Sequence, residues 1–207
     1  MSSTRSASRP VGVHFDGDLR PALIAAAVGA LEDVGPEQLS LRAVARGIGV
    51  SHAAPAHHFG DKAGLLTAIA IEGFQLFTEH LERALTARIE EPLGQLAQLG
   101  RAYAEFAQLH PGHFAVMFRP ALTHTGDAAY AEASDTAFAA LYHHIELCQR
   151  AGWRTDADTR TLAIAAWGLA HGIAVLRTQG SLARHFPDRS LDGVATLAAT
   201  LIGPALD

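Results

Sequence analysis

Histidine, whose imidazole can bind a metal or transfer a proton, occurs 12 times among 207 residues. Zinc sites in proteins use histidines at fixed helical spacings or together with paired cysteines. His110 and His113 are three residues apart, but a Pro-Gly pair separates them, and the adjacent His143 and His144 point in different directions on a helix. The sequence contains no HExxH motif and no cysteine pair. We therefore expect no metal site and no cofactor.

The sequence does not support covalent catalysis either. Cys148, the only cysteine, lies on the apolar face of a predicted helix, and no GxSxG motif is present. A lone cysteine also excludes an internal disulfide and favours a reducing compartment. The chain has no run of 18 apolar residues, and its first ten residues are polar. We predict a cytoplasmic protein that is not an enzyme and has no membrane partner. A metal-dependent helical enzyme is the least favoured hypothesis.

A second set of polar side chains lies between Ser40 and Lys62. Ser40 and Ser51 are typical N-caps, and Gly49 lies in the turn between the two short helices that they predict. Such a pair is typical of a helix-turn-helix, whose second helix enters the major groove of DNA. Lys62, the only lysine, opens the next helix, where its charge and the free N–H groups favour a phosphate.

Caps, glycines and prolines divide the chain into about nine predicted helices. Alanine, the best helix former, occurs 41 times, and no stretch alternates β-branched residues as a strand would. The predicted class is therefore all-α. The first predicted helix stops at Gly35-Pro36, and Thr155 caps the eighth. The predicted ranges are 18–34, 41–48, 51–59, 62–88, 92–109, 111–118, 127–151, 155–179 and 188–202.

The charge is unevenly distributed along the chain. Residues 1–62 carry six basic and six acidic side chains, whereas residues 63–207 carry ten basic and fifteen acidic ones and so account for the net charge of −5. A DNA-binding protein needs only a locally basic surface. The neutral first part therefore permits DNA binding without requiring it.

Two segments of the first part resemble the TetR family of bacterial transcriptional regulators, and residues 14–20 resemble the start of that family's first helix. The segments are Leu41-Arg42-Ala43-Val44-Ala45-Arg46-Gly47-Ile48-Gly49-Val50-Ser51 and His57-His58-Phe59-Gly60-Asp61-Lys62-Ala63-Gly64-Leu65-Leu66. The resemblance covers roughly residues 14–70. It implies an all-α homodimer that binds double-stranded DNA and responds to a small-molecule effector.

This resemblance divides the chain into a disordered arm (1–13), a helix-turn-helix domain (14–62) and a ligand-binding and dimerisation domain (63–207). It assigns DNA contacts to Ser40, Arg42, Ser51, His52, Ala53, Ala54, His57, His58 and Lys62. Two positions depart from the family pattern. Ala56 replaces a usual tyrosine and so removes a phenolic contact to phosphate, and Pro55 falls near the fourth position of the predicted recognition helix, where it would remove one backbone hydrogen bond.

The eighth predicted helix contains Trp167-Gly168-Leu169-Ala170-His171-Gly172, which resembles the C-terminal domain type marked by Trp, His and Gly at this spacing. The family resemblance implies a ligand cavity between the fifth and eighth helices. Its candidate lining is Phe106, Phe114, Met117, Phe118, Tyr142, Trp167 and His171. Since no Arg or Lys is among these residues, we expect an uncharged or weakly polar effector.

The predicted ninth helix carries an apolar stripe of Leu191, Val194, Leu197 and Leu201. With the eighth helix it predicts a four-helix interface between two subunits. The leading hypothesis is a dimeric repressor that a small molecule releases from a palindromic operator. The alternative, suggested by Ala56 and the neutral front charge, is a helical protein that binds or sequesters a small molecule and has weak DNA affinity.

Overall fold

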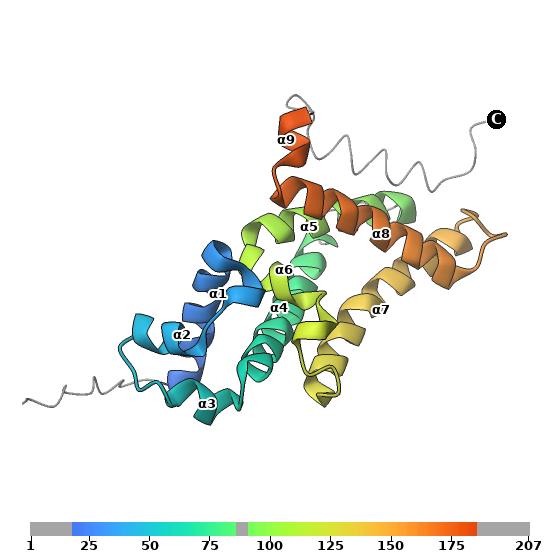
Figure 1. Ribbon diagram of the computed structural model, residues 1–207. Helices are drawn as coiled ribbons and strands as arrows, with labels where there is room; N and C mark the ends of the chain where they lie inside the picture. The colour runs from blue at the N-terminus through green and yellow to red at the C-terminus, as the bar shows by residue number, and fades with distance from the viewer. Residues whose placement is uncertain (1–17, 86–90, 186–207) are drawn as a thin grey trace, which may run out of the picture.

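The computed structural model describes residues 18–85 and 91–185. All regular elements in these ranges are helical, which confirms the predicted all-α class (Figure 1). The elements are α1 (Leu19–Gln38), α2 (Leu41–Gly47), α3 (Ala54–Phe59), α4 (Lys62–Leu85), α5 (Pro92–Leu109), α6 (Pro111–Met117), the 3-10 helix η1 (Pro120–Leu122), α7 (Ala128–Arg150), α8 (Thr159–Thr178) and α9 (Ser181–His185). The predicted arm at 1–13 and the predicted helix at 188–202 lie outside the described residues.

Two predicted helix caps are confirmed. The Ser40 hydroxyl accepts a hydrogen bond from the backbone N–H three residues later, at 3.5 Å, where α2 starts. The Asp127 carboxylate accepts bonds from the N–H groups two and three residues later, at 2.9 and 3.1 Å, where α7 starts. These side chains satisfy backbone donors that have no partner inside the helix.

The predicted cap at Thr155 is wrong. The eighth helix begins at Thr159, and the Asp158 carboxylate accepts a hydrogen bond from the Thr161 N–H at 2.8 Å. A carboxylate both accepts this bond and interacts favourably with the positive end of the helix dipole.

The helical backbone of α1 is interrupted at Gly35, where the sequence predicted that the first helix stops. Gly35 has φ +70° and ψ 167°, a conformation that favours glycine, and one further turn follows it to Gln38. The predicted break at Gly35-Pro36 therefore lies inside α1.

The predicted recognition helix begins two residues later than expected from a cap at Ser51. The Ser51 hydroxyl accepts a bond from the Ala53 N–H at 3.3 Å, and these residues form a turn before α3 starts at Ala54. Pro55 is consequently the second helical residue, not the fourth. A backbone N–H at that position has no partner inside the helix, so the proline removes no hydrogen bond.

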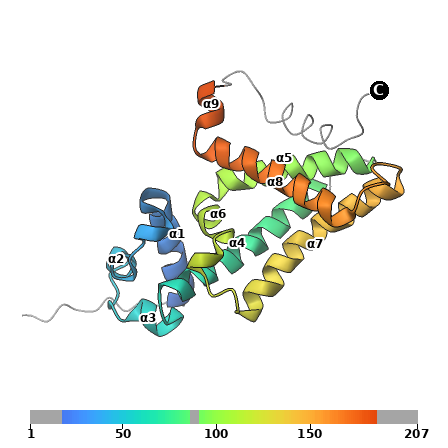
Figure 2. The ribbon, with the colours of Figure 1, turned by 45° about the vertical axis from the view of Figure 1, so that its right-hand side comes forward.

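Figures 1 and 2 show two groups of helices joined by α4. One group, α1 to α3, packs on the first half of α4, in a core that includes Leu23, Val44 and Leu66. The other group, α5, α7 and α8, packs on the second half through Phe74, Phe77 and further apolar residues. The helix α4 thus belongs to both cores. Its first half is part of the front core, which therefore extends past Lys62, the predicted end of the front domain.

The short helix α6 is pressed between α1 and α4. A Cβ added to Gly112 would lie 2.6 Å from the carbonyl oxygen of Val28 on α1. A Cβ added to Gly73 of α4 would lie 2.8 Å from the sulfur of Met117 on α6. Glycine at both crossings therefore sets the distance between α6 and its two neighbours.

This packing predicts that Gly112→Ala lowers the free energy of unfolding by about 1–3 kcal/mol, since the rigid backbone of Val28 cannot move aside as a side chain would. The matched control is Gly29→Ala in α1, where an added Cβ meets nothing within 4 Å. This control should raise stability by up to about 1 kcal/mol through helix propensity. Urea unfolding measures both, and equal effects would contradict the close contact.

Candidate functional site

The helix-turn-helix is held by small residues and one glycine. Val44 and Ala45 of α2 are 3% and 0% exposed, so the helices cross closely there. Gly49 has φ +73°, and the Val50 N–H donates to the Ala45 carbonyl at 3.0 Å, which closes the turn. The glycine at this point is required by its backbone conformation.

The sequence-predicted DNA residues lie along one stretch of surface at α2, α3 and the turn before α3. Six are exposed, and three are partly buried. The exposed residues are Ser40, Arg42, Ser51, His52, Ala53 and His57, and the partly buried ones are Ala54, His58 and Lys62. The structure therefore leaves most of this surface open to a partner.

Lys62 also has a structural contact. Its ammonium group donates to the Glu37 carbonyl oxygen at 2.6 Å, which ties the start of α4 to the end of α1. An ammonium has three N–H donors, so two remain for a phosphate.

Asp61 and Gly64 stabilise the turn between α3 and α4. Asp61 accepts a bond from the Gly64 N–H at 2.7 Å, and this bond, followed by the His124 contact, lowers the pKa of Asp61. A Cβ at Gly64 would overlap the Phe59 carbonyl oxygen, so only glycine fits.

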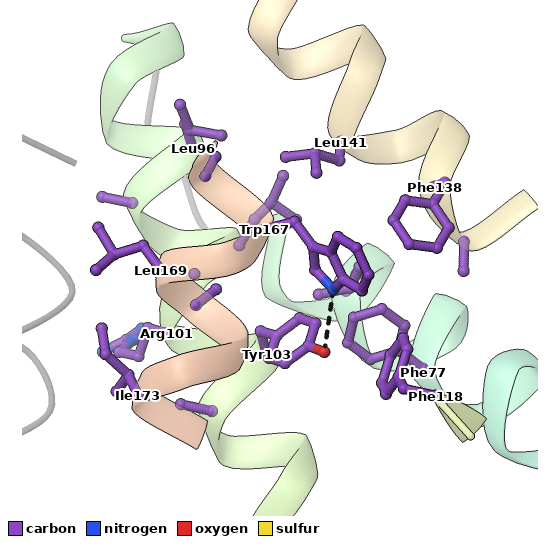
Figure 3. A pocket seen from close by; sticks show the side chains of 18 of the residues that line it. Phe77, Leu96, Arg101, Tyr103, Phe118, Phe138, Leu141, Trp167, Leu169 and Ile173 are labelled. Carbon is purple, nitrogen blue, oxygen red and sulfur yellow. Dashed lines mark hydrogen bonds between the residues drawn. The ribbon is translucent and has the colours of Figure 1, made fainter. Parts of the chain in front are cut away.

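A cavity lies among α4, α5, α7 and α8, and Phe118, which follows α6, is part of its lining beside Phe77 (Figure 3). Its volume is about 80 Å³, below the roughly 300–1,000 Å³ usual for small-molecule pockets. The lining consists of Phe74, Phe77, Leu81, Leu96, Ala97, Leu99, Gly100, Arg101, Tyr103, Ala104, Phe118, Ala137, Phe138, Leu141, Ala166, Trp167, Leu169, Ala170 and Ile173. An effector of ordinary size must widen this space.

Three polar side chains form a hydrogen-bonded chain at the cavity wall. The Trp167 indole N–H donates to the Tyr103 hydroxyl at 3.4 Å, and that hydroxyl lies 2.8 Å from Nδ1 of His171. Burial lowers the pKa of His171 and raises that of Tyr103, so both are neutral near pH 7. The tyrosine hydroxyl, which accepts from the indole, can therefore donate to the imidazole nitrogen.

The sequence-predicted ligand residues divide around this cavity. Phe118 and Trp167 line it. Phe114 contacts Phe118 edge-to-face and His171 contacts Trp167 in a tilted arrangement, at ring-centroid distances of 5.6 and 5.9 Å. The remaining predicted residues do not line the cavity: Phe106 and Met117 are 0% and 1% exposed in the core, and Tyr142 is 36% exposed at the surface.

Sequence reasoning missed the contribution of α4 to the lining, and it selected Tyr142 rather than Phe138 and Leu141 on α7. Phe74, Phe77 and Leu81 of α4 recur at spacings of three and four residues, which places them on one face. These three residues follow the part of α4 that is buried in the front core, and their spacing was the signal that α4 continues into a second core. Phe138 and Leu141 supply the wall from α7.

The sequence-predicted lining contained no Arg or Lys, whereas the lining of the cavity in the structure includes an arginine. Arg101 is part of the wall, with its Nε 3.8 Å from a carboxylate oxygen of Glu105 and about a third of its side chain exposed. No signal in the sequence indicated that Arg101 would line the cavity, because the residues on either side of it in α5 are mostly apolar.

Within residues 18–85 and 91–185, no group of three potential ligands could hold a metal ion. Cys148 is buried, and burial raises its thiol pKa to about 11, which keeps the thiol protonated and unreactive near neutral pH.

Comparisons with known proteins agree with this architecture. Residues 96–201 match the family described as "Tetracyclin repressor-like, C-terminal domain", and residues 23–69 match "Bacterial regulatory proteins, tetR family". The chain belongs to the TetR family. Because the matching C-terminal description does not mention the Trp-His-Gly spacing, that subtype stays a prediction.

Several solved structures resemble the fold of this chain. A protein of unknown function from Rhodococcus sp. RHA1 is 33% identical, with a TM-score of 0.76, over 92% of this chain and 96% of that one. The TetR regulator PfmR from Thermus thermophilus is 24% identical, with a TM-score of 0.61, over 89% and 98%. No curated protein sequence matches the chain.

The two halves of this TetR-family chain are also tied by the segment that follows α6. Arg119 forms an ion pair with Glu37 at the end of α1. His124 lies 3.0 Å from Asp61 at the start of α4, and its backbone N–H donates to the Thr67 hydroxyl at 2.8 Å. Since Phe118 lines the cavity, one short segment contacts both the cavity and the helix-turn-helix domain.

The hydrogen-bonded chain predicts that Tyr103→Phe lowers the free energy of unfolding by about 1–3 kcal/mol, because the indole N–H and Nδ1 of His171 lose their shared partner. Tyr142→Phe removes a hydroxyl from a half-exposed position and is the control. Chemical denaturation at neutral pH measures both variants. Equal losses would show that the Tyr103 hydroxyl contributes nothing specific.

Proposed function

We propose that this chain is a homodimeric, ligand-responsive transcriptional regulator, in which a small molecule releases a repressor from a palindromic operator. One observation carries the proposal. The helix α4 begins beside α3, where Lys62 lies, and supplies Phe74, Phe77 and Leu81 to the cavity at its other end. A shift of α4 or of the helices on it would therefore change both places.

The proposed DNA contact uses α3 as the recognition helix. The exposed turn before it, with Ser51, His52 and Ala53, has small side chains that let the backbone approach the major groove. Ser40 and Arg42 at the start of α2 would meet phosphate. Ala56 is exposed and adds no such contact.

For DNA binding, we predict that Lys62→Ala weakens binding to all sequences alike and lowers the salt slope by roughly one unit. Lys62→Arg should keep the slope because it keeps the charge. Arg150→Ala removes an exposed cation from α7 and should change neither quantity. Fluorescence anisotropy over a salt series measures the slope, and an unchanged slope in Lys62→Ala would leave this lysine only its structural contact with Glu37.

The proposed dimer uses the outer face of α8. Ile164 and Leu176 are 63% and 46% exposed, and a Cβ added at Gly168 or Gly172 meets nothing within 4 Å. Because these residues share one side of the helix, they form an apolar strip on which a partner helix could pack closely. The predicted stripe at 191–201 would complete the four-helix interface.

The membrane is a second conceivable partner for α8, which by length and its mean hydropathy of 1.3 could cross a bilayer. Packing of α8 on α5 and α7 favours the interpretation as a core and interface helix. We therefore propose a cytoplasmic location.

For assembly, we predict that Ile164→Glu converts the dimer to a folded monomer, since a buried carboxylate without a partner is costly. The dimer interface should bury more than about 1,200 Å² in total. Leu109→Glu is the matched control, because Leu109 is 65% exposed at the end of α5, away from this strip. Sedimentation at micromolar concentration distinguishes the states, and a wild-type monomer would overturn the assembly.

The proposed switch is a competition between two shapes of the dimer. The effector must favour a shape whose recognition helices no longer match the operator half-sites. A coupling of about 1–3 kcal/mol is typical, and operator DNA must weaken effector binding by the same factor.

The second candidate is a protein that binds or sequesters a small molecule and grips DNA weakly. The absence of a tyrosine at Ala56 and the neutral charge of residues 1–62 favour it. Selection of bound duplexes from a random DNA pool separates the candidates. Enrichment of one palindrome supports the regulator, and no enrichment supports sequestration.

A further inference from the structure

We infer that Arg20 forms a phosphate-binding site at the end of the recognition helix, where the ring of Phe59 holds its guanidinium. The ligand of this site is a phosphodiester of the DNA backbone. The inference rests on the proposed DNA-binding function and adds a contact that the family resemblance does not assign.

Arg20 is the second residue of α1. The Asp18 carboxylate caps this helix and accepts a hydrogen bond from the Arg20 backbone N–H at 3.0 Å, which fixes where the side chain leaves the helix. Leu19 packs against the front core, whereas Arg20 is exposed. Figures 1 and 2 both show the first turn of α1 beside α3. The Arg20 side chain therefore lies at the edge of the surface proposed to meet DNA.

The guanidinium of Arg20 lies over the ring of Phe59, the last residue of α3, at 5.2 Å from the ring centroid. A cation at this distance is attracted by the negative face of the ring. Stacking of this kind uses the face of the guanidinium, while its N–H donors point outward in its plane. Within residues 18–85 and 91–185 these donors make no hydrogen bond. Phe59 thus positions a guanidinium whose donors are available to a phosphate.

The charge of Arg20 is not neutralised by an ion pair. Four other arginines each pair with a glutamate: Arg83, Arg101, Arg119 and Arg150. In the described part of the chain no carboxylate forms such a pair with Arg20. Two acidic residues at the neighbouring helix ends already have partners, because Asp18 caps α1 and Asp61 accepts from the Gly64 N–H and contacts His124. Arg20 therefore offers its charge to a polyanion.

Arg20 and Lys62 are cations at the same end of α3. Lys62 follows Phe59 by three residues and opens α4. A helix in the major groove has a sugar-phosphate strand on each side, and contacts with these strands fix its register and orientation. Arg20 and Lys62 together would hold the strand beside the end of α3. A guanidinium already fixed on a ring loses little entropy when it binds.

The test follows binding of the full-length protein to a fluorescein-labelled duplex of mixed sequence by anisotropy over a salt series. A length of about 30 base pairs accommodates two half-sites separated by one or two helical turns. Loss of one phosphate contact retains about one more counterion on the DNA, so Arg20→Gln should lower the salt slope by roughly one unit. At a fixed salt concentration the affinity should fall about tenfold, the low end for a hydrogen bond to a charged group.

The palindrome selected from the random pool should lose affinity by the same factor, because a phosphate contact carries no sequence information. Arg20→Lys keeps the charge and should keep the slope. Arg150→Gln is the matched control, because it removes the same charge from an exposed arginine at the end of α7 and should change neither slope nor affinity.

Phe59→Leu tests the positioning by the ring. In this background Arg20→Gln should weaken binding less than it does in the unmodified protein, because the guanidinium is no longer held. The comparison of the two single variants with the double variant removes any general effect of Phe59→Leu on the front core. Equal losses in the two backgrounds would contradict the role of the ring.

The outcomes separate this inference from the proposed function. An unchanged slope in Arg20→Gln, together with a lowered slope in Lys62→Ala, would overturn the Arg20 site and leave DNA binding in place. Equal losses of slope in Arg20→Lys and Arg20→Gln would also overturn it, because a structural role of Arg20 does not depend on its charge. If the unmodified protein binds neither duplex, both the site and the proposed regulator are wrong. A slope that Gln lowers and Lys keeps supports both.

Discussion

The arrangement of the whole molecule depends on the close contact of α6 with its two neighbours. Gly112 brings the backbone of α6 against the Val28 carbonyl of α1, and Gly73 brings α4 against Met117 of α6. His113 of α6, which is nearly buried, adds a 3.0 Å contact between its Nε2 and the Glu72 carboxylate of α4. Side chains at these crossings would separate the helices, so the absence of a Cβ fixes how the front helices sit on the rest.

The same contact explains why α4 can serve two cores. Its first half is buried among α1 to α3, and its second half supplies aromatic rings to the cavity. Edge-to-face contacts of Phe77 with Tyr103 and Phe106, both at 5.1 Å, anchor this second half on α5. Because a helix transmits a displacement along its length, the aromatic end and the Lys62 end cannot be positioned independently.

Local chemistry made most of the fold predictable. Pro92 and Pro111 begin helices where the sequence predicted them, and the Ser40 cap is confirmed by its hydrogen bond. The failures occur where two local signals compete. Ser51 caps a turn rather than a helix, and Asp158 replaces Thr155 as a cap, because several residues in each stretch can accept a backbone hydrogen bond. The cavity was less predictable, since it depends on which helix faces meet, and periodicity gives a face but not its partner.

The segment after α6 adds a second route between the two ends of the molecule. Phe118 contacts Trp167 at a ring-centroid distance of 5.9 Å, and the next residue, Arg119, pairs with Glu37. The Glu37 carbonyl in turn receives the Lys62 ammonium. Because the cavity is smaller than an ordinary effector, a ligand that enters must displace some of its wall, and Phe118 is the lining residue joined most directly to these ties. A displaced Phe118 would move Arg119 against Glu37, and the end of α1 and the start of α4 would respond together. By this route an increase in the volume of the cavity would change the orientation of α3.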